Sequence, residues 1–63
     1  MRLSAYTARV TTTNGSVVEC LTRGSDARAA LTNLRRSRRG DWTRIEVGLG
    51  EGDSFRMLQE TSR

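Results

Sequence analysis

Two strand-like stretches flank the dipeptide Asn14-Gly15, and this arrangement narrows the choice of folds more than any other part of the sequence. Residues 3–12 and 16–23 are rich in threonine and valine, which favour strands. Asn-Gly is the strongest short-range signal for a β-hairpin, because a type I′ turn needs positive φ at both central positions. The turn predicts a register with Val17 opposite Thr12, Glu19 opposite Val10 and Leu21 opposite Ala8. This register places Glu19 on the apolar face, and either a bulge or an edge position would resolve the conflict.

Residues 27–38 have the pattern of an amphipathic helix. Apolar residues recur at intervals of three and four and form a narrow stripe: Ala27, Ala30, Leu31 and Leu34. Ser25 is expected to cap the N-terminus of this helix, Asp26 favours the positive end of its dipole, and Gly40 is a good stop.

Residues 42–49 and 53–59 are expected to form a second hairpin, joined by the loop Gly50-Glu51-Gly52. The expected register pairs Val47 with Phe55, Ile45 with Met57 and Glu46 with Arg56. The first two pairs make both strands apolar on the same face, and the third is a cross-strand ion pair.

The order strand, strand, helix, strand, strand predicts an α+β fold, with one helix packed on a largely antiparallel four-stranded sheet. A chain of 63 residues is too short for a second independent core, so residues 1–63 are expected to form a single domain. The last three residues, 61–63, are expected to fray.

The composition argues against an enzyme. The sequence has no histidine and a single cysteine, Cys20, which excludes a histidine base, a Cys-His nucleophile pair and an internal disulfide. Cys20 lies mid-strand and is expected to be a small buried hydrophobe. The seven acidic residues show no metal-loop spacing. We therefore predict a protein with no catalytic residues, no metal and no cofactor.

The hydropathy of the sequence indicates where in the cell the protein is expected to be. The sequence has no run of 18 apolar residues, so no membrane-spanning helix is expected. The start, Met1-Arg2-Leu3-Ser4, lacks the apolar stretch of a signal peptide. The prediction is a cytoplasmic protein without a membrane partner.

All eleven basic residues are arginine, and the net charge is +4. A GC-rich genome explains such a bias, and so does selection for guanidinium groups that grip phosphate or carboxylate. On a helical wheel one flank of the apolar stripe carries Arg28, Arg35 and Arg39, and Arg36 points outward. We call these four residues the arginine flank. Thr32 lies among them. The arginine flank is either a solvated surface or a contact for the phosphate backbone of DNA or RNA, or for an acidic protein.

A second candidate surface is the sheet face away from the helix. In the expected register it carries a set of residue types that are enriched in interface hot spots: Trp42, Arg44, Arg56 and Leu58. These residues form a candidate protein-binding site. The alternative for Trp42 is to fold over the sheet edge as a satellite of the core.

Three segments carry a resemblance to a known class of proteins. They are the hairpin from Tyr6 to Leu21, the helix start Ser25-Asp26-Ala27 with Ala30-Leu31, and Thr43-Arg44-Ile45 in the third strand. Together they resemble small phage-encoded host-takeover proteins such as the T7-type inhibitors of bacterial RNA polymerase. In that family third-strand arginines contact the polymerase, so the resemblance implies a partner-binding role for Arg44. Glu46 stands where a second arginine would be expected, and this helix is more basic than in that family.

These observations lead to three functional hypotheses. The first is a non-enzymatic binding protein of phage or mobile-element type that modulates or inhibits a host protein complex acting on nucleic acid, in transcription or defence. The second is an accessory protein that binds nucleic acid through the arginine flank. The third is a homodimeric structural or assembly protein, because a chain this short is marginally stable alone.

Overall fold

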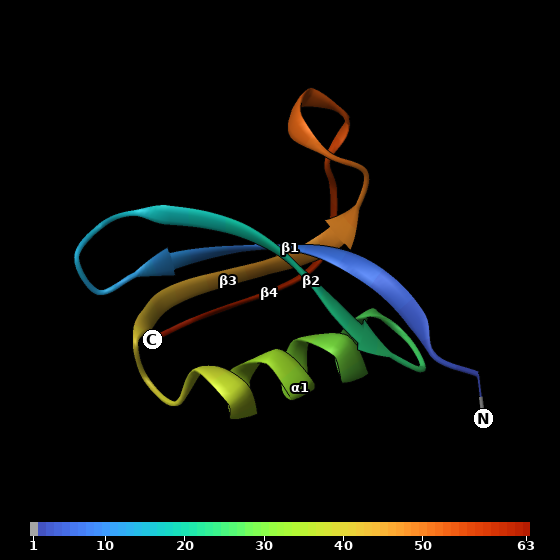
Figure 1. Ribbon diagram of the computed structural model, residues 1–63, viewed down its shortest axis with the longest axis horizontal. Helices are drawn as coiled ribbons and strands as arrows, with labels where there is room; N and C mark the ends of the chain where they lie inside the picture. Colours follow the sequence, from blue (N-terminus) through green and yellow to red (C-terminus); the bar gives the residue numbers. More distant parts are fainter. Residues whose placement is uncertain (1) are drawn as a thin grey trace.

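The computed structural model of this chain describes residues 2–63, which form a four-stranded antiparallel sheet and one α-helix (Figure 1). In chain order the elements are β1 (Ser4–Thr12), β2 (Val17–Gly24), α1 (Ala27–Arg38), β3 (Trp42–Leu49), the 3-10 turn η1 (Gly52–Ser54) and β4 (Arg56–Ser62). This architecture confirms the predicted α+β fold and its order of elements. The observed bounds of α1 and β3 are also the predicted ones.

The strands lie in the order β2-β1-β3-β4, so β1 and β3 form the centre of the sheet and β2 and β4 its edges. Each neighbouring pair is antiparallel. The helix α1 crosses one face, from the end of β2 to the start of β3 (Figure 1). In the described chain no α-helix covers the opposite face, which we call the open face.

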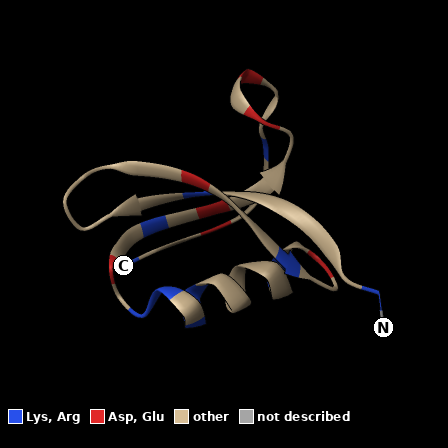
Figure 2. Ribbon diagram, in the orientation of Figure 1, with Lys and Arg blue, Asp and Glu red and all other residues tan. Residues whose placement is uncertain are grey.

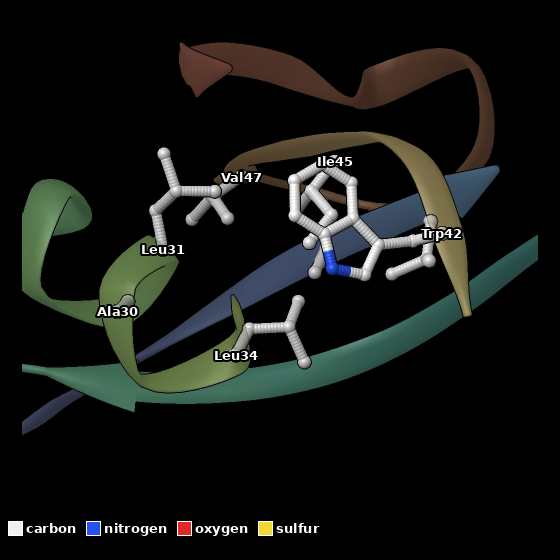
Figure 3. Packing of buried hydrophobic residues seen from close by; sticks show 8 residues of the cluster. Ala30, Leu31, Leu34, Trp42, Ile45 and Val47 are labelled. Carbon is white, nitrogen blue, oxygen red and sulfur yellow. The ribbon is translucent and has the colours of Figure 1, made fainter. Parts of the chain in front are cut away.

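The hydrophobic core lies between α1 and the sheet (Figure 3). Its buried residues come from the helix and the two central strands: Ala8, Val10, Ala30, Leu31, Leu34, Trp42, Ile45 and Val47. The predicted apolar stripe of the helix is confirmed, since three of its four residues are buried and Ala27 packs against them. Cys20 is half-buried and packs against the same core.

The N-cap of the helix lies one residue later than expected. Asp26, in extended conformation, is the N-cap, and its carboxylate accepts a hydrogen bond of 2.8 Å from the backbone N–H of Ala29. The prediction that Ser25 caps the helix is therefore wrong. At the other end Arg39 adopts the left-handed conformation, with φ of 52°, and its N–H donates to the carbonyl of Arg35. Gly40 follows with φ of 108°, as expected of a helix stop.

The β1–β2 hairpin has a register one residue away from the predicted one. Thr11 pairs with Val17, Val10 with Val18, Arg9 with Glu19, Ala8 with Cys20 and Thr7 with Leu21. The loop contains three residues, Thr13, Asn14 and Gly15, and only Gly15 has positive φ. A shift of one residue moves every β2 side chain to the other face. Val17 and Leu21 are therefore exposed, and Glu19 no longer lies on the apolar face.

The β3–β4 register also differs from the prediction. Val47 pairs with Gln59, Glu46 with Glu60 and Gly48 with Met57, with a bulge between Val47 and Gly48. The reason is the connection, which contains η1 and extends to Phe55 instead of ending at Gly52. Consequently β4 begins and ends three residues later than predicted. The expected fraying of 61–63 is wrong, because Thr61 pairs with Ile45 and the N–H of Arg63 donates to the carbonyl of Thr43.

A second irregularity changes the position of Trp42. The pairing of β1 with β3 passes from Thr11–Arg44 to Thr12–Trp42, so Thr43 is skipped. Strict alternation would place Trp42 and Arg44 on the same face, whereas the irregularity turns the indole ring toward α1. Trp42 is only 3% exposed and lies in the core (Figure 3). The predicted placement of Trp42 on the open face is wrong. Its ring packs within the core between α1 and the sheet, and does not fold over a sheet edge as a satellite of that core.

Candidate anion-binding surface

The predicted protein-binding residues are not brought together on the open face. Trp42 is buried beneath the helix, and only Arg44, Arg56 and Leu58 remain available at the surface. The guanidinium group of Arg44 lies 2.8 Å from a carboxylate oxygen of Glu60 and 3.5 Å from one of Glu46. The expected ion pair between Glu46 and Arg56 is therefore replaced by a cluster around Arg44.

Arg9, the other arginine at the centre of the open face, is also engaged. Its Nε lies 3.4 Å from a carboxylate oxygen of Glu19, and its Nη2 donates to the carbonyl of Gly52 at 2.6 Å. The guanidinium group also stacks over the ring of Phe55, 4.3 Å from its centre. The β3–β4 connection thus folds over Arg9, and the central arginines of this face already have partners.

On the helix side the arginines have a different environment. Arg28, Arg35 and Arg36 are exposed on α1, and Arg39 follows as the C-cap. Among residues 2–63, none of these four arginines forms an ion pair, while the neighbouring Arg38 pairs with Asp41 at 3.3 Å. Figure 2 shows basic segments gathered at the C-terminal half of α1, whereas most acidic segments lie on the strands and loops.

A shallow hollow of about 320 Å³ lies beside the arginine flank. We call it the arginine hollow, and it is lined by Thr32, Arg35, Arg36, Trp42 and Arg63. Within the described chain Arg63 forms no ion pair either. The hydroxyl of Thr32 donates to the carbonyl of Arg28 and keeps its own lone pairs free. Three guanidinium groups therefore border one depression.

Trp42 forms the base of the arginine hollow and orders two of its arginines. The guanidinium carbon of Arg63 lies 4.7 Å from the centre of the ring, and that of Arg35 lies 5.9 Å away. A guanidinium group that stacks on an aromatic ring keeps its N–H groups as donors. The indole Nε1 is buried and has no hydrogen-bond partner within residues 2–63. The tryptophan thus acts as a rigid support and not as an exposed contact.

Sequence reasoning missed the contribution of Arg63, because the last residues were expected to fray. Pairing of Ser62 with Arg44 carries β4 to the end of the described chain and fixes the position of Arg63 next to α1. The available signal was Thr61, a strand-favouring residue that continues the strand past Gln59. Three residues of the arginine flank, by contrast, lie on α1 as predicted.

The comparisons with known proteins do not add a relative. No family model, no curated protein and no solved structure matches this chain. The resemblance to phage-encoded inhibitors therefore stays a prediction.

Two further properties concern the described residues alone. Within 2–63, no group of three or more histidine, cysteine, aspartate or glutamate side chains is placed to hold a metal ion. The single helix of this part of the chain is neither long nor apolar enough to cross a membrane. The predictions of a non-enzymatic protein and of a cytoplasmic location stay predictions.

Proposed function

We propose that this protein binds the phosphate backbone of nucleic acid through the arginine flank and Arg63. The observation that carries the proposal is that three arginines without an ion pair gather at the arginine hollow, whereas the arginines at the centre of the open face are paired. Arg9 and Arg44 of the open face are bound to carboxylates, whereas the three arginines of the hollow have no carboxylate partner among residues 2–63. An anion that approaches the helix side therefore meets positive charge that is not compensated locally.

Guanidinium chemistry suits a phosphodiester. The planar fork of an arginine donates two parallel hydrogen bonds to phosphate oxygens, which a lysine cannot do. Arg28 and Arg35 lie on the same side of α1, seven residues apart, and at about 1.5 Å per residue they are separated by about 10 Å. This separation matches the reach of a few successive phosphates along one strand.

The same surface supports binding without base recognition. Trp42 is buried and Phe55 lies beneath Arg9, so neither ring is free to stack on a base. The third aromatic ring of the described chain, Tyr6, is half-buried and packs against the core. The proposal is thus contact with the backbone, with little dependence on nucleotide sequence.

The proposal is tested by fluorescence anisotropy with a labelled duplex and a labelled single strand of mixed sequence. For three to four phosphate contacts, the log of the association constant should fall with the log of the salt concentration with a slope of about −3. The double variant Arg35→Glu with Arg36→Glu should lose about tenfold or more in affinity. The double variant Arg2→Glu with Arg56→Glu reverses the same number of charges away from the arginine hollow, so it is the matched control and should bind with unchanged affinity. A flat salt response, or an equal loss in the control, contradicts the proposal.

The hypothesis of a host protein complex stays a prediction with a weaker candidate surface. It loses Trp42 as its anchor, and Arg44 is already paired with Glu46 and Glu60. A pull-down with and without nuclease separates the two functions. Proteins that remain bound after nuclease treatment would favour a protein target, whereas loss of all bound material would favour nucleic acid.

A further inference from the structure

The edge strand β2 has a hydrogen-bonding edge that no other strand of the described chain occupies. β2 pairs with β1 without any register shift and has no other neighbour in the sheet of residues 2–63 (Figure 1). Proteins commonly protect such edges with proline, lysine or a bulge. The whole sequence has neither proline nor lysine, so the charged residues of β2 are Glu19 and Arg23, and Val17 and Leu21 are 65% and 69% exposed.

The register of the hairpin shows which backbone groups point away from β1. The N–H of Thr12 donates to the carbonyl of Ser16, so Thr12–Ser16 is a hydrogen-bonded pair. Because such pairs alternate along an antiparallel ladder, the even-numbered residues of β2 bond to β1. The odd-numbered residues direct their N–H and carbonyl groups to the free edge. Asn33 confirms this parity, because its side chain donates to the carbonyl of Arg23 at 2.8 Å.

The side chains along this edge are complementary to their own copy. The open face of β2 carries Glu19, Leu21 and Arg23. The leucine lies in the middle, with the acid two residues before it and the base two residues after it. An antiparallel copy related by a twofold axis at Leu21 sets each glutamate opposite an arginine and the two leucines opposite each other. Opposite charges and apolar pairs directly across a ladder are both stabilising.

We propose that β2 pairs with β2 of a second copy of this chain, antiparallel about a twofold axis at Leu21. In this register Leu21 exchanges two backbone hydrogen bonds with Leu21 of the partner subunit. The N–H of Arg23 donates to the carbonyl of Glu19 of the partner subunit, and the symmetric bond forms as well. The N–H of Glu19 donates to the carbonyl of Arg23 of the partner subunit. The same carbonyl also accepts the hydrogen bond from the side chain of the partner subunit's Asn33.

Other symmetric registers are less complementary. An axis at Glu19 would set two carboxylates opposite each other, which is destabilising. An axis at Cys20 would set Glu19 opposite a leucine and Val17 opposite an arginine. Only the axis at Leu21 matches both the charges and the apolar residues of the strand.

The pairing has a geometric consequence for the helix side. A twofold axis perpendicular to the sheet keeps both copies of α1 on the same face of a continuous sheet. The two arginine flanks would then face the same direction. The dimer does not depend on the proposed binding of nucleic acid, because β2 and the arginine hollow share no residue.

The first test is the molar mass of the full chain by sedimentation equilibrium over a range of concentrations. The wild-type protein should reach twice the mass of the chain. Leu21→Arg should remain monomeric, and circular dichroism should show that its fold is retained. Leu58→Arg places the same charge on the other edge strand, β4, and should still dimerise. A wild-type protein that stays monomeric at every concentration overturns the proposal.

Charge exchange and cross-linking test the register. Glu19→Arg and Arg23→Glu should each weaken the dimer, and the double variant should restore it. In a Cys20→Ser background, Leu21→Cys should form an intermolecular disulfide under mild oxidation, because hydrogen-bonded partners lie about 5.5 Å apart between Cα atoms. If wild-type Cys20 cross-links and the engineered cysteine does not, the axis lies at Cys20 and the proposed register is wrong.

Discussion

The guanidinium carbon of Arg63 lies 4.7 Å from the centre of the Trp42 ring, so the end of β4 reaches across to cover a core residue beside α1. The backbone N–H of Arg63 also donates to the carbonyl of Thr43, which holds this end in place. One contact therefore links the stability of the fold to the arrangement of the arginine hollow.

Trp42→Ala should lower the free energy of unfolding of the protein. Its effect should not come from the loss of a surface contact. Truncation of a buried tryptophan costs about 3–5 kcal/mol in unfolding free energy. Trp42→Phe keeps most of the apolar volume and removes the unpartnered indole N–H, so it should cost less than the alanine variant. Urea denaturation followed by circular dichroism measures both. If the alanine and phenylalanine variants lost the same unfolding free energy, the assignment of the indole as a buried ring with an unpartnered N–H would be wrong.

Arg63→Ala should lower stability slightly and loosen the arginine hollow. An exposed cation–π contact contributes about 0.5–1 kcal/mol, which for a domain of this size corresponds to a Tm lower by about 2–8 °C. Differential scanning calorimetry measures the shift. Arg56→Ala is the comparison, since Arg56 is exposed on β4, the strand that precedes Arg63, and has no ring beneath it among the contacts of residues 2–63. A matching shift in Arg56→Ala would show that the stacking has no effect.

Gly48→Ala should be strongly destabilising. A Cβ atom at this position would overlap the carbonyl oxygen of Arg56 and lie 2.7 Å from its carbon, because the bulge brings the two strands together there. Relieving that overlap requires a backbone shift, and overpacking of this kind costs about 1–3 kcal/mol. Gly52→Asn tests a glycine with open space around it, and asparagine tolerates its left-handed conformation. Thermal unfolding should therefore separate the two variants clearly.

Asp26→Ala should weaken the start of α1. Loss of the bond from Ala29 to the N-cap carboxylate costs about 0.5–2 kcal/mol. Asp26→Asn retains a capping oxygen and should stay close to wild type. Ser25→Ala should have little effect, since Ser25 lies outside the cap. Chemical denaturation measures the free energy of unfolding of the three variants. If Ser25→Ala had the largest effect, the assignment of Asp26 as the N-cap would be wrong.

The secondary structure was largely predictable because it depends on local patterns. The Ala-Leu stripe defined α1 and alternation defined β3, and both have the expected bounds. The registers were not predictable, because each depends on the conformation of a loop. Gly15 alone adopts positive φ after Asn14, and η1 lengthens the second connection. These shifts moved Leu21 to the surface and brought Arg63 to the arginine hollow.

The candidate sites differed in predictability for the same reason. Arg28, Arg35 and Arg36 depend only on the helical repeat, and the helix presents them as expected. The open-face set depended on strict alternation in β3, which the irregularity at Thr43 interrupts. Trp42 therefore became a core residue although its neighbour Arg44 stayed on the open face.

The pairing of β1 with β3 has a consequence for how the chain folds. β1 forms a hairpin with β2, its neighbour in sequence. The other edge of β1 pairs with β3, which follows α1 in the chain, so this pairing closes a much longer loop. Closing such a long loop costs chain entropy before any contact offsets it, so this encounter is expected to limit the folding rate. Substitutions of Val10 or Ile45, which pair across β1 and β3, should therefore slow folding. Substitutions in β4, which docks onto β3, should mainly accelerate unfolding.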